Sequence, residues 1–100
     1  MYQEKFIARS YVMTENSIGY KLEYYIFSEP IQNGMIYGIT IKQYEENVIK
    51  EEQSEVVSKG KEDIEKLIDC FARNFVFPCS LIDIIADMGQ ANRIPAKMVI

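Results

Sequence analysis

The sequence predicts an α+β domain: a four-stranded antiparallel β-meander followed by two C-terminal helices packed on one face of the sheet. In the first half of the chain, apolar and polar residues alternate over four segments separated by turn formers, which is typical of half-buried strands. From residue 61 onward the apolar residues recur at helical spacing instead. A chain of 100 residues suits one domain with its own core, and we assign residues 1–89 to it.

Short loops join the predicted strands, which favours antiparallel neighbours. Pro30 is expected to end the pairing of the second strand, and Asn33-Gly34 predicts a hairpin turn. Gly38 in the third strand indicates either a bulge or a place where another backbone comes close. The charged residues of the fourth strand suit a sheet edge. The strands are expected at Phe6–Met13, Gly19–Phe27, Ile36–Tyr44 and Val48–Val57.

The first helix is expected to begin after Gly60 and to end at Asn74, a residue that tolerates left-handed backbone. Pro78 cannot lie inside that helix but fits the first position of the second one, which Gly89 is expected to end. Residues 90–100 then form a C-terminal tail that is partly ordered or docks as an extra strand. The predicted core consists of Leu22, Ile26, Ile39, Ile41, Ile64, Leu67, Ile68, Phe71, Phe75, Leu81, Ile84 and Ile85.

The second strand is apolar or aromatic on both faces. Leu22 and Ile26 belong to the face that the helices cover, whereas the other face changes along the strand from Lys21 and Glu23 to Tyr25 and Phe27. A small domain tends to cover such an aromatic patch by self-association. Tyr25 and Phe27 are therefore the predicted interaction surface.

The charge pattern argues against nucleic acid and membrane partners. The net charge is −4, and residues 44–69 carry nine acids and four bases, a local charge of −5. Such a region lacks the attraction for phosphate groups that both partners require. No apolar run reaches the roughly 18 residues of a membrane span, and the first residues do not resemble a signal peptide. We therefore expect a cytoplasmic protein.

No catalytic, cofactor-binding or metal-binding set of residues is predicted. The chain has no histidine, the commonest general base and zinc ligand. Asp83 and Asp87 are interpreted as an exposed acidic helix face. Cys70 and Cys79 are expected to be free and buried, as in a reducing compartment. Cys79 follows Pro78 at a helix start, where the helix dipole favours a thiolate, so Cys79 is the one candidate reactive thiol. The alternative interpretation is an inert, packed side chain.

Three short segments carry a resemblance to a known family: Tyr37-Gly38-Ile39-Thr40-Ile41, Phe77-Pro78-Cys79-Ser80-Leu81 and Asp83-Ile84-Ile85-Ala86-Asp87. In them the chain resembles an uncharacterised family of short clostridial proteins, domain of unknown function 6514. The resemblance covers about the last two thirds of the chain, without residues 1–14 or the tail after Gly89. It implies a small bacterial cytoplasmic protein with no assigned activity and no family catalytic residues.

The leading functional hypothesis is a non-enzymatic protein-interaction or regulatory module, either a homodimer or bound to an unidentified protein partner. Its basis is the two-sided apolar strand together with the lack of a catalytic set of residues. The alternative is a small-molecule-binding protein or enzyme with a pocket between sheet and helices, in which Cys79 and the tyrosines supply the polar groups.

Overall fold

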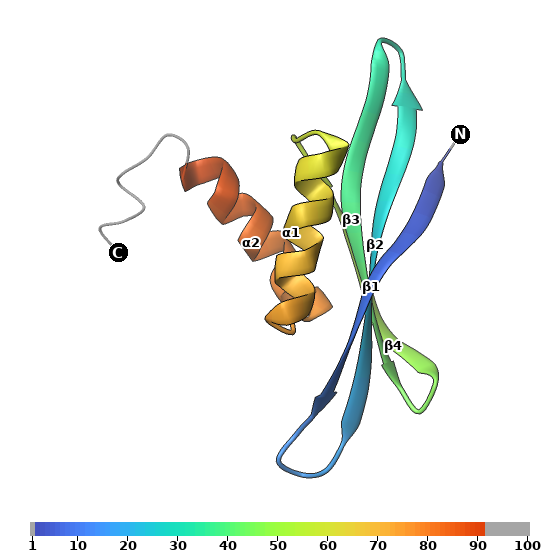
Figure 1. Cartoon of the computed structure of the whole chain (residues 1–100), viewed down its shortest axis with the longest axis vertical. Helices are drawn as coiled ribbons and strands as arrows, with labels where there is room; N and C mark the ends of the chain where they lie inside the picture. The colour runs from blue at the N-terminus through green and yellow to red at the C-terminus, as the bar shows by residue number, and fades with distance from the viewer. Residues whose placement is uncertain (1, 92–100) are drawn as a thin grey trace.

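The computed structural model describes residues 2–91 of the chain and confirms the predicted architecture (Figure 1). The four strands form one antiparallel sheet in the order β1-β2-β3-β4, followed by two helices. Seen edge-on, both helices lie on the same side of the sheet (Figure 1). No helix within residues 2–91 has the length and apolar character needed to cross a membrane. The elements are β1 (Gln3–Met13), β2 (Gly19–Ile31), β3 (Gly34–Glu45), β4 (Val48–Val57), α1 (Lys61–Arg73) and α2 (Pro78–Ala91).

Tight turns hold the strands in register. Glu46 and Asn47 form a two-residue turn between β3 and β4 with φ values of 52° and 66°. Two successive left-handed residues match the natural twist of a hairpin. Between β1 and β2 the Thr14 hydroxyl accepts a hydrogen bond of 3.1 Å from the N–H of Ile18. Both loops follow the turn signals of the sequence.

The pairing of β2 with β3 continues further than predicted. Pro30 was expected to end it, but Pro30 pairs with Met35, and the strands separate only after Ile31 and Gly34. The reason is that β1 pairs no further along β2 than Ser28, so Pro30 has a strand on one side only. A residue without an N–H is tolerated at such an edge.

The core lies between the helices and one face of the sheet. α1 packs against β1, β2 and β3, and α2 packs against β4 and β3. Leu67, Ile84 and Ile85 are partly buried against this core, as predicted. The prediction overlooked Tyr24 and Val57. A tyrosine carries a polar hydroxyl and Val57 is the last residue of its strand, so neither is recognised as a core residue from the sequence alone. The fully or almost fully buried core residues are Leu22, Tyr24, Ile26, Ile39, Ile41, Val57, Ile64, Ile68, Phe71 and Leu81.

The prediction for Phe75 is wrong. Its side chain is 50% exposed, and Phe75 rather than Asn74 adopts the left-handed conformation, with a φ of 53°. The end of α1 explains both facts. The N–H of Val76 donates to the carbonyl of Phe71 at 3.1 Å and the N–H of Phe75 donates to that of Ala72 at 3.4 Å. These two bonds form a Schellman motif, whose left-handed position is usually glycine and here turns an aromatic ring toward solvent.

The second helix begins at Pro78, as predicted, but its end differs. Gly89 was expected to end it, whereas α2 continues to Ala91. A glycine in the last turn of a helix costs about 1 kcal/mol relative to alanine, which is too little to end it by itself. Of the predicted tail, residues 92–100 lie outside the described residues, so its docking as an extra strand stays a prediction.

Two side-chain hydrogen bonds join the sheet to the helices. The Ser10 hydroxyl of β1 donates to the carbonyl of Ala72 at 2.5 Å, and the Tyr24 hydroxyl of β2 donates to that of Val76 at 3.0 Å. Both acceptors belong to the end of α1 or to the connection after it. The Tyr24 hydroxyl thus supplies a donor to the Val76 carbonyl, and the Ser10 hydroxyl is a second donor to the Ala72 carbonyl, which also accepts from the N–H of Phe75. Burial also raises the pKa of Tyr24 to about 12.

Gly38 provides space for an aromatic ring of the neighbouring strand. It pairs with Phe27 on β2 and Val56 on β4 without a register shift, so it is not a bulge. A Cβ atom at this position would overlap the Phe27 ring and the backbone oxygen of Glu55. Of the two interpretations offered by the sequence, the close approach is the correct one.

We predict that Gly38→Ala lowers the free energy of unfolding by about 2 kcal/mol, since the new methyl group must displace a ring and a backbone carbonyl. Gly19→Ala is the matched control, because its Cβ would meet only the Met13 side chain at an ordinary 3.6 Å. Urea titration of both variants measures the difference. Equal stability of the two variants would contradict the packing described for Gly38.

For Tyr24→Phe we expect a loss of about 1 kcal/mol at neutral pH, because the carbonyl of Val76 loses its donor. A second effect appears at high pH. The pKa of Tyr24 is about 12 in the folded protein and 10.0 in the unfolded chain, so the folded state holds more protons between these values. Stability therefore falls as the pH rises through this window, and the variant lacks that part of the fall. Tyr11→Phe, at an exposed position, is the control for urea titrations from pH 7 to 11.5.

Candidate interaction surface

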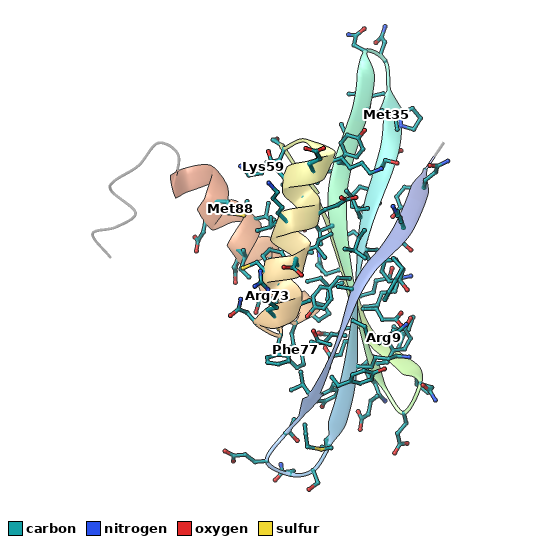
Figure 2. The ribbon with its side chains drawn as sticks, in the orientation of Figure 1. Arg9, Met35, Lys59, Arg73, Phe77 and Met88 are labelled. Carbon is teal, nitrogen blue, oxygen red and sulfur yellow. The ribbon has the colours of Figure 1, made fainter. Side chains whose placement is uncertain are left out.

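The sheet has one face that no helix of the described residues covers (Figure 1). On β2, Leu22, Tyr24 and Ile26 belong to the core, so Glu23 and Tyr25 point the other way. Figure 2 shows the same division for the labelled side chains: Arg9 lies on the side of the sheet away from the helices. We call this the open face, and it contains the predicted surface residues.

A buried carboxylate lies near the centre of the open face. Glu23 is 7% exposed, and Arg9 across the strand pair donates to its Oε2 atom from Nε at 3.2 Å and from Nη2 at 3.1 Å. The Tyr25 hydroxyl donates to Oε1 at 2.7 Å, and the Lys21 ammonium lies 3.8 Å from Oε2. Both carboxylate oxygens are thus engaged, as a buried charge requires.

These contacts set the protonation of the carboxylate and of its neighbour. Burial by itself would raise the pKa of Glu23, but the hydrogen bonds from Tyr25 and Arg9 and the nearby positive charges outweigh it, so the pKa is lowered. Burial and the Glu23 carboxylate together raise the pKa of Tyr25 well above its ordinary value. At neutral pH the pair is therefore one carboxylate and one neutral phenol.

A second ion pair joins the outer strands across the open face. The Lys42 ammonium on β3 lies 3.1 Å from Oε1 of Glu4 on β1, spanning β2 between them. The same ammonium lies 4.4 Å from the ring centre of Tyr25. On the same face Lys21 lies 4.5 Å from the ring centre of Tyr44. Cations over aromatic rings are attracted by the ring electrons, so these contacts order both partners.

Of the two predicted surface residues, Tyr25 is half-buried and Phe27 is only 6% exposed. The Tyr2 ring stacks on Phe27 at 5.4 Å between centres, and the Phe6 ring meets Tyr25 edge-on at 5.7 Å. The aromatic groups that face solvent are therefore on β1. Whether this surface binds a partner stays a prediction, but Tyr2 and Phe6, rather than Phe27, would form the contact.

Sequence reasoning missed the contribution of β1 because the strand contains a bulge. Phe6 pairs with Tyr25 and Ala8 with Tyr24, so Ile7 is an extra residue and the alternation of faces changes there. The signal that could have identified this contribution was the aromatic content of the first strand. A strict period of two does not place these aromatic residues on one face of the sheet. By register, the exposed apolar side chains of the open face are Tyr2, Phe6, Tyr11, Met13, Ile31, Ile49 and Val56.

The charges of the open face nearly balance. Three bases and four acids give a net charge of −1, compared with −4 for the whole chain. Most of the excess of acids therefore lies elsewhere on the molecule. This small negative charge weighs further against a phosphate-rich partner at this face. The seven residues are Arg9, Lys21, Lys42, Glu4, Glu23, Glu29 and Glu52.

The two cysteines are free, but both are exposed rather than buried as predicted. Cys79 is the second residue of α2, and its neighbours Pro78 and Leu81 take the inward positions instead. It lines neither of the two cavities found against the sheet. Among residues 2–91 the Cys79 thiol has no hydrogen-bond partner, and its reactivity stays a prediction.

The acidic residues of α2 lie on its exposed side. Asp83 and Asp87 are both exposed, as the interpretation of an acidic helix face requires. Among residues 2–91 no group of three or more candidate ligands has the geometry to hold a metal ion.

Comparison with known proteins yields one match. The model of a family of unknown function, DUF6514, matches residues 3–91. The match therefore includes β1, which the sequence resemblance had left out, and reaches the end of α2. No curated protein and no solved structure shows a significant match to the chain.

We predict that Glu23→Gln destabilises the protein at neutral pH by about 2 kcal/mol, since Arg9 and Lys21 lose their counter-charge. The lowered pKa of Glu23 means that the unfolded chain holds more protons just below its ordinary value of 4.5. The wild type therefore loses stability as the pH falls through that region, and the variant should lose less.

Urea titrations between pH 3 and 7 measure this difference. Glu15→Gln in the exposed β1–β2 loop is the control and should give a curve close to that of the wild type. A variant as stable as the wild type at pH 7, with the same acid slope, would show that Glu23 does not organise the open face.

Proposed function

This chain belongs to DUF6514, a family of unknown function, and on that premise we propose that it is a non-enzymatic interaction module that forms a homodimer through its open face. The observation that carries the proposal is the set of exposed apolar side chains on a sheet face without a covering layer. Tyr11 and Met13 are each 69% exposed, and Val56 on the opposite edge is 50% exposed. Monomeric proteins rarely leave several such groups exposed on one sheet face, so a partner surface is the simplest cover.

The charge distribution favours a second copy of this chain as the partner. Two molecules that each carry −4 repel one another over most of their surfaces. The open face is much less charged, because its three bases and four acids nearly cancel. In a twofold dimer each face meets an identical face, so a face with charges of both signs can be self-complementary. The ion pairs of Glu23 and Glu4 also leave no unpaired buried charge for the partner to neutralise.

The size of the face is sufficient. The strands have 10 to 13 residues, which at about 3.3 Å per residue gives a length of roughly 33–43 Å. Four strands about 4.8 Å apart give a width of roughly 19 Å, hence a face of about 600–800 Å². Stable interfaces bury about 800 Å² per partner. Two such sheets packed about 10 Å apart would resemble a β-sandwich, with the helices on the outside.

Light scattering coupled to size exclusion at micromolar concentration tests the proposal. We expect a mass of twice the 11.6 kDa chain. A mass of 11.6 kDa at protein concentrations up to about 100 μM would overturn the homodimer. It would mean that the free energy of dimerisation is weaker than about −5.5 kcal/mol.

Substitutions locate the interface. Tyr11→Glu and Val56→Glu place a charge on the open face without touching the core, and each should shift the protein to the monomer, with a dissociation constant raised about a hundredfold. Ile82→Glu is the matched control, since Ile82 is 52% exposed but lies on α2. If the control dissociates the dimer and the two sheet variants do not, the interface lies on the helices.

A further inference from the structure

The other face of the sheet has a cavity where the helices do not reach. The β2–β3 hairpin extends beyond the N-terminal end of α1 (Figure 1). At this end, on the helix side, lies a cavity of about 500 Å³. Its volume is within the range of small-molecule sites, roughly 300–1,000 Å³.

Three strands and one helix contribute to the walls. Lys5 of β1 is paired with Ile26 of β2, so both side chains belong to the helix face. Ser28 is paired with Tyr37 of β3 on the same face. Lys61, the first residue of α1, closes the cavity from the helix side. Met35, which also lines it, is labelled near the hairpin tip in Figure 2.

The two lysines give the cavity an uncompensated positive charge. Within residues 2–91 neither Lys5 nor Lys61 forms an ion pair or a side-chain hydrogen bond. Glu4 contributes to the wall, but its carboxylate is occupied by the Lys42 ammonium at 3.1 Å. Glu62, the next residue of α1, lines a separate depression along the helix.

The neutral groups of the cavity are suited to a ligand as well. The hydroxyls of Ser28 and Tyr37 have no hydrogen-bond partner within the described residues, so both are available. Ile26 and Met35 supply an apolar surface, and Met35 is 46% exposed as it stands. At the start of α1, Gly60 has no side chain to cap the first N–H groups, but Glu62 and Asp63 in the first turn offset their positive potential, so the two lysines supply the charge of the cavity.

We propose that this cavity binds a small organic anion, a molecule with one acidic group on an apolar or aromatic body. The acidic group would lie between Lys5 and Lys61, within reach of the two hydroxyls, and the body would cover Ile26 and Met35. A lysine ammonium is a point charge and lacks the two-pronged geometry with which arginine selects carboxylates and phosphates. The two lysines therefore suit any compact anion, and the ligand class is defined by its negative charge and its apolar body. The site is on the face opposite the proposed dimer interface, and neither proposal depends on the other.

Fluorescence titration with 8-anilinonaphthalene-1-sulfonate tests this inference, because that probe carries a sulfonate on an aromatic body. The wild type should bind it saturably at one site per chain. In Lys5→Gln/Lys61→Gln the affinity should fall about tenfold, the combined effect of two partly exposed charge contacts. N-phenyl-1-naphthylamine, which lacks the sulfonate, should bind both proteins equally.

A matched variant separates the site from the overall charge. Lys50→Gln/Lys59→Gln removes the same two charges from exposed positions outside the cavity and should leave the affinity unchanged. An equal loss in both double variants, or none in the first, would overturn the proposal, and so would a lack of saturation. Near-ultraviolet circular dichroism confirms that each variant is folded.

Amide chemical shifts locate the probe. In ¹H–¹⁵N spectra of the wild type, the signals of Ser28, Tyr37 and Lys61 should move together with the fluorescence titration. Movement confined to residues of the open face, such as Tyr11, would assign the probe to the other side of the sheet and contradict the site. The Tyr11→Glu variant should bind the probe as the wild type does.

Discussion

The carboxylate of Glu23 is the group on which the organisation of the uncovered side of the sheet depends. It is almost wholly withdrawn from water, and its charge is stabilised by Arg9, Tyr25 and Lys21 from two adjacent strands. An unpaired charge in that position would cost several kcal/mol. The network therefore requires β1 and β2 to be in one register, and it orders the aromatic rings around it. A sheet with helices on one side alone thus has a defined structure on the other side too.

The two sides of the sheet are built on different principles. The helix side is apolar and depends on burial of branched side chains such as Ile39 and Ile41. The open side combines ion pairs with rings, and its apolar groups gather toward the outer strands. The two central strands are enclosed on both sides, which accounts for their runs of consecutive buried residues, Leu22 to Tyr24 on β2 and Gly38 to Ile41 on β3. Such an arrangement leaves the two proposed surfaces, one for a second copy and one for an anion, physically separate.

Much of this architecture was predictable from the sequence. Alternation and turn residues identify the strands, and the change of period after Gly60 identifies the helices. Local sequence patterns failed to predict the exposure of a side chain where backbone hydrogen bonds or a residue distant in the chain determine it. Phe75 reads as a core residue, but the hydrogen bonds at the end of α1 turn it outward. Phe27 reads as exposed, but Tyr2, far away in the chain, covers it. The partners of Glu23 could not be predicted because the bulge at Ile7 sets the register.

The contact between Phe27 and Gly38 has a consequence for how this chain and its relatives can diverge. The ring occupies the volume that a side chain at position 38 would need, and Tyr2 closes it from above. The three positions therefore share one packed volume, although they lie on two strands, β2 and β3, and on the residue before β1. A family member with a larger residue at position 38 should carry a smaller one at position 27, and with no ring there the aromatic residue at position 2 loses its function. Substitutions at these sites should be inherited together.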